Sequence, residues 1–211
     1  MGRAIAVDGS GNVYVAGQST ASWGSPVRPY TAALDAYVAR LNAATGALTW
    51  NTFLGGTGTD VGNSIAVDSN DSVSVVGQSS ATWGSPVRPY TAGDDAYAAR
   101  LNAATGALTW HTFLGGTGAD VGNSIAVDSN DSVSVVGQSS ATWGSPVRPY
   151  TAADAFVAQL DVSTGALTWN SFLGGADGGD VGYAVAMDGN VYVAGSSSAS
   201  GQSGAPCHRW Q

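Results

Sequence analysis

Residues 60–92 read DVGNSIAVDSNDSVSVVGQSSATWGSPVRPYTA, and residues 120–152 repeat this stretch without a change. Looser copies begin at residues 1 and 180. Equivalent positions follow one another at intervals of 60 residues, as at Ile5, Ile65, Ile125 and Val185. A fixed period of this kind is the signature of a repeat architecture, in which similar units stack on one another.

Each unit contains four short strand patterns. Residues 64–68 (SIAVD) and 72–77 (SVSVVG) are apolar or alternating runs on either side of a turn cluster, so they predict a β-hairpin. A long polar connection then leads to residues 96–101 (AYAARL) and 108–114 (LTWHTFL). The turn between these two runs, NAATG, ends in a glycine suited to a left-handed conformation. Four strands joined by turns make up one blade of a β-propeller.

We therefore predict an all-β fold, a β-propeller-type array of about 3.5 four-stranded blades. A solenoid coil uses fewer residues per repeat, and a sandwich does not require near-identical units. Closed propellers have about 4–8 blades, so we expect this array to be open or incompletely closed. The predicted units are blade 1 (1–57), blade 2 (58–117), blade 3 (118–176), a half blade (177–199) and a divergent tail (200–211).

The composition supports strands and narrows the range of partners. The chain has 30 glycines, all its acidic residues are Asp and all its basic ones Arg, so the common residues of helix surfaces are missing. A net charge of −8 argues against nucleic acid, and no apolar run is long enough to span a membrane. The single Cys207 excludes an internal disulfide framework. Residues 1–3 lead directly into a strand pattern, so we expect no secretion signal in this chain.

The strand-rich parts resemble the SBBP β-propeller repeats of bacterial proteins. The resemblance rests on residues 6–17 (AVDGSGNVYVAG), on the segment DAYVARLNAATGALTW and on the following FLGG, and it extends to about residue 199. It implies a propeller in a secreted or surface-exposed protein, without a defined activity. Residues 41–50 (LNAATGALTW) also resemble a turn of quinoprotein propellers, in which the tryptophan docks blades together. The cysteines and Glu ligand of those enzymes are absent, so quinone chemistry is not expected.

Catalytic and metal-binding patterns are scarce. His111 replaces Asn51 and Asn170 at equivalent positions, so we expect an exposed strand residue, and His208 lies in the tail. Asp68 and Asp71 are interpreted as turn-stabilising residues rather than calcium ligands. Residues 55–60 (GGTGTD) match the start of a calcium-binding nonapeptide but lack its tandem spacing. We therefore expect no catalytic residue, no metal site and no cofactor.

The long connection within each blade is the best candidate for a binding surface. Its WGSPVRPY segment is stiffened by two prolines and occurs three times. Exposed aromatic rings could stack on sugars while arginines donate hydrogen bonds. In the alternative, which we favour, tryptophan folds back onto a blade and arginine pairs with Asp94 or Asp95. The candidate residues are Trp23, Arg28, Tyr30, Trp83, Arg88, Tyr90, Trp143, Arg148 and Tyr150. The other repeated tryptophans, Trp50, Trp110 and Trp169, are expected to be packing residues.

The sequence thus favours a non-enzymatic structural or protein-interaction module. We expect a homo-oligomer or polymer that forms through open blade edges, or a segment of a longer extracellular array, because unpaired strand edges invite pairing. One alternative is a multivalent lectin-like module that binds a glycan through the repeated loops. A second is a fragment of a propeller hydrolase.

Overall fold

The structure is a computed structural model, and it describes residues 1–68, 72–128 and 132–198. These ranges contain fourteen β-strands and no α-helix, and so no helix that could cross a membrane. The predicted all-β class is therefore confirmed. The turn at residues 69–71, with Asp71, and the tail with Cys207 and His208 lie outside the described residues.

The strands form three four-stranded antiparallel sheets and one hairpin, each in simple chain order. Blade 1 consists of β1 (Gly2–Val7), β2 (Val13–Ser19), β3 (Asp35–Leu41) and β4 (Leu48–Leu54). Blade 2 consists of β5 (Asp60–Val67), β6 (Ser72–Ser79), β7 (Asp95–Asn102) and β8 (Leu108–Leu114). Blade 3 consists of β9 (Asp120–Val127), β10 (Ser132–Ser139), β11 (Asp154–Asp161) and β12 (Leu167–Leu173). The half blade is the hairpin of β13 (Val181–Met187) and β14 (Val191–Ser196).

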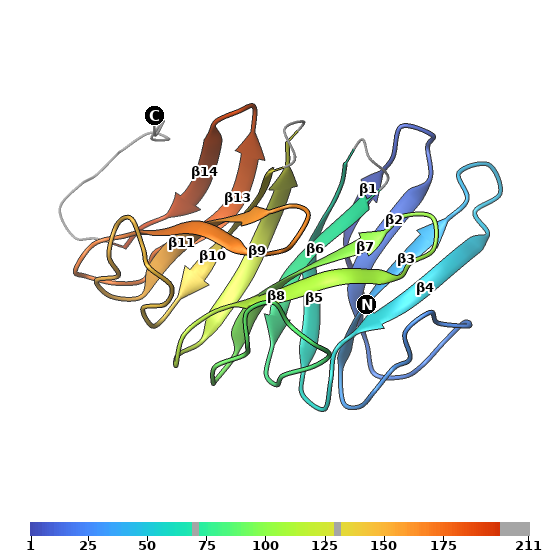
Figure 1. Cartoon of the computed structure of the whole chain (residues 1–211), viewed down its shortest axis with the longest axis horizontal. Coiled ribbons are helices and arrows are strands. Elements are labelled where there is room, and N and C mark those ends of the chain that lie inside the picture. The colour runs from blue at the N-terminus through green and yellow to red at the C-terminus, as the bar shows by residue number, and fades with distance from the viewer. Residues whose placement is uncertain (69–71, 129–131, 199–211) are drawn as a thin grey trace.

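The blades stack in a row that does not close into a ring. The first strand of each blade packs against the first three strands of the blade before it: β5 on β1, β2 and β3, β9 on β5, β6 and β7, and β13 on β9, β10 and β11. Blade 1 and the half blade lie at opposite ends of the row (Figure 1). The predicted array of about 3.5 blades is therefore open.

The hydrophobic core lies between blades rather than inside any one of them. One cluster joins Tyr14 and Val38 of blade 1 to Val75, Leu101 and Phe113 of blade 2. A second cluster joins blades 2 and 3 in the same way. A single sheet has no interior, so each blade buries its faces only against its neighbours.

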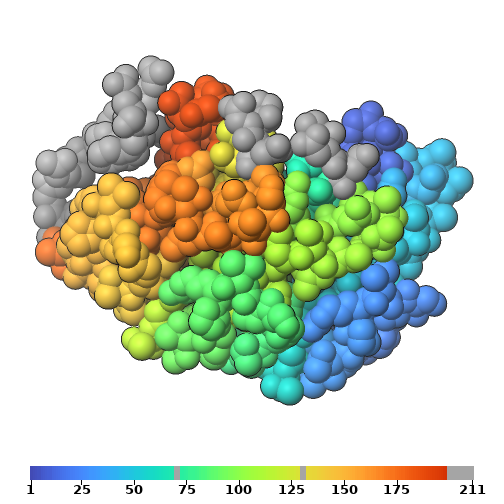
Figure 2. Space-filling view, in the orientation of Figure 1, coloured from blue at the N-terminus to red at the C-terminus, as the bar shows by residue number. Residues whose placement is uncertain are grey.

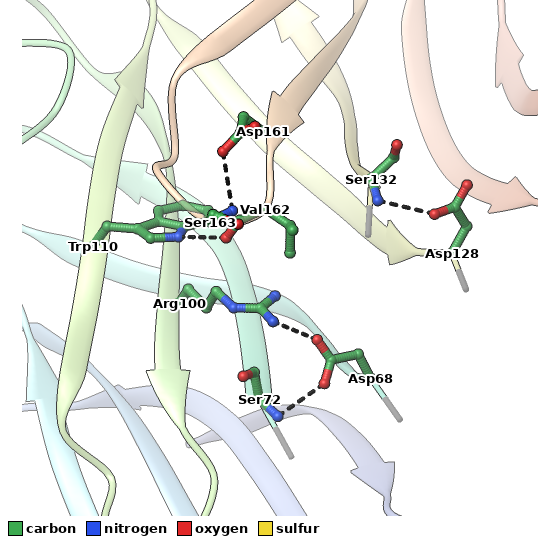
Figure 3. A network of polar contacts seen from close by, with 9 residues as sticks. All are labelled: Asp68, Ser72, Arg100, Trp110, Asp128, Ser132, Asp161, Val162 and Ser163. Carbon is green, nitrogen blue, oxygen red and sulfur yellow. Dashed lines mark hydrogen bonds and ion pairs between the residues drawn. The ribbon is translucent and has the colours of Figure 1, made fainter. Parts of the chain in front are cut away.

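A tryptophan on the last strand of blade 1, and its equivalent in blade 2, dock on the next blade. Trp50 Nε1 donates to the carbonyl oxygen of Ala103 at 2.9 Å, and Trp110 Nε1 donates to that of Val162 at 2.8 Å (Figure 3). Both indoles are buried, which confirms their predicted packing role. Trp169 is partly exposed, and its Nε1 donates to Gln159 of its own blade instead.

The docked indole lies directly on a glycine of the next blade. At Gly106, φ is +72°, and an added Cβ would lie 2.7 Å from Cδ2 of Trp50. Gly46 ends the identical turn of blade 1 with φ of +67°, and an added Cβ there would meet nothing within 4 Å. The two turns thus share a backbone conformation and differ in whether an indole covers them.

This pair provides a matched test of the blade junction. We expect Gly46→Ala to cost about 1–2 kcal/mol of unfolding free energy, the cost of a left-handed residue with a side chain. Gly106→Ala carries the same cost and also pushes Trp50 out of its seat, so we expect at least about 2 kcal/mol more. Urea unfolding of both variants measures the difference. Equal losses would show that the indole contact adds nothing to stability.

Candidate functional site

The three long loops connect the second and third strands of each complete blade, at residues 20–34, 80–94 and 140–153. They follow one another along one side of the molecule, coloured blue, green and gold in Figure 2. The repeat thus brings the nine candidate residues into register, one Trp, one Arg and one Tyr per blade.

The loop tryptophans fold inward. Trp83 and Trp143 are each only 4% exposed. The Trp83 ring packs edge-on against Tyr97 and Phe113, with ring centroids 5.5 and 6.1 Å apart. Trp23 is partly exposed and packs against Tyr37 in the same way. Trp83 and Trp143 therefore fold back onto a blade, as favoured from the sequence, and expose no ring face for stacking on sugars.

The loop arginines join consecutive blades. The guanidinium of Arg28 donates to the carbonyl oxygens of Phe53 and Gly55, at 2.9 and 2.8 Å. Its centre lies 5.1 Å from the Trp83 ring of the next blade, a cation–π contact. Arg88 makes the equivalent hydrogen bonds and lies 5.5 Å from the ring of Trp143. The main hydrogen-bond partners are thus carbonyl oxygens rather than the aspartates expected from sequence.

The loop tyrosines of blades 1 and 2 join the two ends of their loops. The Tyr90 hydroxyl donates to the carbonyl oxygens of Ser80 and Gly93, at opposite ends of the loop. Tyr30 does the same in blade 1. The rings of Tyr30, Tyr90 and Tyr150 pack on Phe53, Phe113 and Phe172, respectively. Each loop is therefore a packed part of its blade.

The prediction that His111 is an exposed strand residue is wrong, because its side chain is buried. Its ring stacks on Trp83 with centroids 3.9 Å apart, and Nε2 lies 2.7 Å from the Trp83 carbonyl oxygen. That oxygen can only accept, so Nε2 carries the proton. Asn51 and Asn170 donate to the carbonyl oxygens of Trp23 and Trp143. All three side chains hold the long loop by the same bond.

Sequence reasoning missed a pair of buried aspartates at each junction. Asp95 begins β7 of blade 2 and Asp120 begins β9 of blade 3, and both are fully buried. An added Cβ at Gly115 would lie 2.5 Å from Asp95 Oδ1 and 2.7 Å from Asp120 Oδ2, so the two carboxyl groups border the same space. The signal available in the sequence was an Asp at the start of the first and third strands in successive units.

An equivalent pair of buried aspartates lies at the junction of blades 1 and 2. Asp35 and Asp60 border Gly55 as the other pair borders Gly115. Burial, together with the like charge of its partner, raises the pKa of Asp60 to about 6, and the same causes raise the pKa of Asp95 to about 6. The positive charge of Arg28 or Arg88 acts in the opposite direction. The junction of blades 1 and 2 and the junction of blades 2 and 3 thus each hold one aspartate, Asp60 and Asp95 respectively, that titrates near pH 6.

Asp68 has the turn-stabilising role that was predicted for it. Its Oδ1 accepts from the backbone N–H of Ser72 at 2.9 Å, and its Oδ2 forms an ion pair with Arg100 at 2.5 Å (Figure 3). In the first copy, Asp8 accepts from the backbone N–H groups of Ser10 and Asn12. Within the described ranges, no group of three or more His, Cys, Asp or Glu side chains is arranged to hold a metal ion.

The buried aspartates predict a stability that falls as pH rises. A raised folded-state pKa means that the folded protein binds the proton more tightly than the unfolded chain. This contribution is complete below about pH 4 and is lost as pH rises through about 6. We expect the melting temperature to be several degrees higher at pH 5 than at pH 7.5, at roughly 2–4 °C per kcal/mol.

Asp95→Asn should flatten this pH profile, because the amide has the shape of the protonated acid and cannot ionise. Asp161→Asn is the control, since Asp161 is exposed at the end of β11 and the hydrogen bonds that it accepts from Thr164 lower its pKa. Calorimetry between pH 5 and 7.5 measures both variants. A wild-type profile that rises with pH would contradict the argument.

Two substitutions test the role of His111. We expect His111→Asn to keep stability within about 1 kcal/mol, because asparagine makes the same bond in the other two blades. His111→Ala leaves the Trp83 carbonyl without its donor and should cost about 1–3 kcal/mol, with a further loss from the cavity. Chemical unfolding distinguishes the two. Equal losses would mean that the hydrogen bond does not hold the loop.

Comparison with known proteins supports the repeat assignment. A search of the curated proteins finds no match. The family model SBBP, described as a beta-propeller repeat, matches residues 2–22, which comprise β1, β2 and the first residues of the long loop. The same pattern returns at intervals of 60 residues in blades with the same strand order. Residues 2–22 thus match a beta-propeller repeat of the SBBP type, and the blades that follow share the strand order of the first blade.

Proposed function

We propose that this protein is a non-enzymatic structural or protein-interaction module that associates with copies of itself or with further blades of a longer array. A secreted or surface location belongs to this proposal and is supported by the repeat resemblance alone. The observation that carries the proposal is the apolar outer face of blade 1. This face has the residues of an internal junction, but no blade covers it.

The comparison with blade 2 makes this clear. Ile5 is 67% exposed, whereas its equivalent Ile65 is 8% exposed because it packs on blade 1. Val7 is 58% exposed. The side chains of Val13, Val15, Tyr37 and Leu41 are partly exposed, and their equivalents Val73, Val75, Tyr97 and Leu101 are fully buried. A contiguous apolar face of this kind marks an interaction site.

The other end of the row offers an open strand edge. Among the strands that the structure describes, β14 pairs only with β13, whereas its equivalent β6 pairs with both β5 and β7. The outer edge of β14 therefore presents backbone N–H and C=O groups that the other second strands use in the sheet. Such an edge favours addition of another strand.

Carbohydrate binding by the long loops is a second proposal with less support. Stacking on a sugar requires an accessible ring, and among the three loop tryptophans only Trp23 is partly exposed. The loop arginines already donate to carbonyl oxygens within the protein. These contacts favour a role for the loop residues in joining blades.

Light scattering on a dilution series tests self-association. We expect the solution mass of the wild type to rise above that of the 21.0 kDa chain at micromolar concentration. The double variant Ile5→Asp/Val7→Asp should remain monomeric, because charges on the face oppose its burial. The control Val27→Asp/Val147→Asp alters two exposed valines of the loops and should associate like the wild type. A wild type that stays monomeric would overturn self-association.

A further inference from the structure

Contacts that join neighbouring blades inside the row are missing at its two ends, and the residues left over at one end match those left over at the other. At internal junctions, an indole lies on the glycine that ends the turn of the next blade, as Trp50 does on Gly106 and Trp110 on Gly165. The equivalent Gly46 of blade 1 has nothing within 4 Å of an added Cβ. Trp169 of blade 3 is partly exposed and bonds within its own blade. Blade 1 thus has an uncovered glycine turn, and blade 3 has a tryptophan of the kind that covers such a turn at the internal junctions.

The arginine contacts show the same relation. Arg148 donates to the carbonyl oxygens of Phe172 and Gly174, as Arg28 and Arg88 do to theirs. The Arg148 side chain therefore has the conformation in which Arg28 and Arg88 place their guanidinium groups over the tryptophan of the next blade. Within the described ranges, no aromatic ring lies under Arg148, and no guanidinium lies over Trp23 of blade 1. A blade 1 placed after blade 3 would complete this pair as well.

Within the described residues, the position after blade 3 is occupied by the hairpin of β13 and β14 alone. No apolar side chain of this hairpin is buried. The equivalent strands β5 and β6 bury Val61, Ile65, Val73, Val75 and Val76. The hairpin covers the inner strands of blade 3 and leaves Trp169 and Leu173 of the outer strand β12 partly exposed. A complete blade would cover all four strands.

The first two strands of blade 1 resemble the β13–β14 hairpin that packs on blade 3. The second strand of blade 1 contains VYVAG at residues 13–17, and the hairpin contains the same letters at residues 191–195. Both hairpins have the same register irregularity directly after their glycine–glycine pair, at Gly2/Ala4 and Gly182/Ala184. The two hairpins are therefore alternative occupants of one position, and blade 1 adds the outer strands β3 and β4.

We propose that blade 1 of a second copy displaces the β13–β14 hairpin and docks on blade 3, so that chains join head to tail. This inference rests on the proposed self-association and identifies its partner and its surfaces. The new junction gains the indole on Gly46, the guanidinium over Trp23 and burial of the Ile5 face, all of which repeat contacts found inside the chain. The two surfaces differ, so the contact is heterologous and can propagate from copy to copy.

Locking the hairpin in place tests the exchange. Val185 N lies 3.3 Å from Ser124 Oγ where β13 packs on β9, so we choose these two positions for a cysteine pair intended to link the hairpin to blade 3. The variant Ser124→Cys/Val185→Cys also carries Cys207→Ser, which leaves only the engineered pair. We expect the reduced form to gain mass with concentration in light scattering and the oxidised form to stay monomeric.

The control locks a junction that does not open. Ser64→Cys/Ile125→Cys, again with Cys207→Ser, places the pair one repeat earlier, between blades 2 and 3, and should associate in both redox states. Association of the oxidised Ser124→Cys/Val185→Cys form would overturn the exchange while leaving self-association intact. Absence of association in every form, including the wild type, would overturn both.

A second variant tests the seat itself. Trp169→Ala removes the indole that would lie on Gly46 of the second copy, and we expect the dissociation constant to rise at least about tenfold. The melting temperature of the monomer should change little, because Trp169 is partly exposed there. An unchanged dissociation constant would exclude this contact from the interface.

Discussion

Burial of a sheet face by the next sheet is the constraint on which this molecule depends. A twisted four-stranded sheet has two faces and no interior, so it becomes stable only when another sheet covers it. The two apolar clusters lie between blades, and the side chains that appear in every repeat meet there. Trp50 docks near the outer turn of the next blade, and Arg28 joins the loop of its own blade to Trp83.

This constraint explains how buried charge is tolerated at the junctions. A carboxylate inside an apolar interface is costly unless hydrogen bonds and opposite charge compensate it. Asp60 and Asp120 accept from the backbone N–H groups of Gly56 and Gly116, which fixes the glycine-rich turn ahead of the first strand. A nearby arginine offsets part of the negative charge. The aspartates thus determine the path of the chain from one blade to the next.

The period and the local alternation were sufficient to predict the strands, the blade and a packing role for Trp50 and Trp110. The period could not predict which way a loop side chain turns, so the burial of Trp83 was left open. His111 was taken as exposed because asparagine stands at the equivalent positions, although the asparagines are themselves buried donors to a loop carbonyl. The aspartate pairs were missed because their members lie on different sheets, and a strand pattern carries no information about that contact.

The identical stretches at residues 60–92 and 120–152 also bear on how the chain reaches its native arrangement. The hairpins β5–β6 and β9–β10 have the same sequence, so early in folding each can pair with the third strand of either blade at nearly equal energy. Only the short connections along the chain favour the correct choice, through the lower entropy cost of closing a small loop. Repeat proteins are prone to such misassembly. Near-perfect repetition thus makes the blades uniform and makes kinetic traps during folding more numerous.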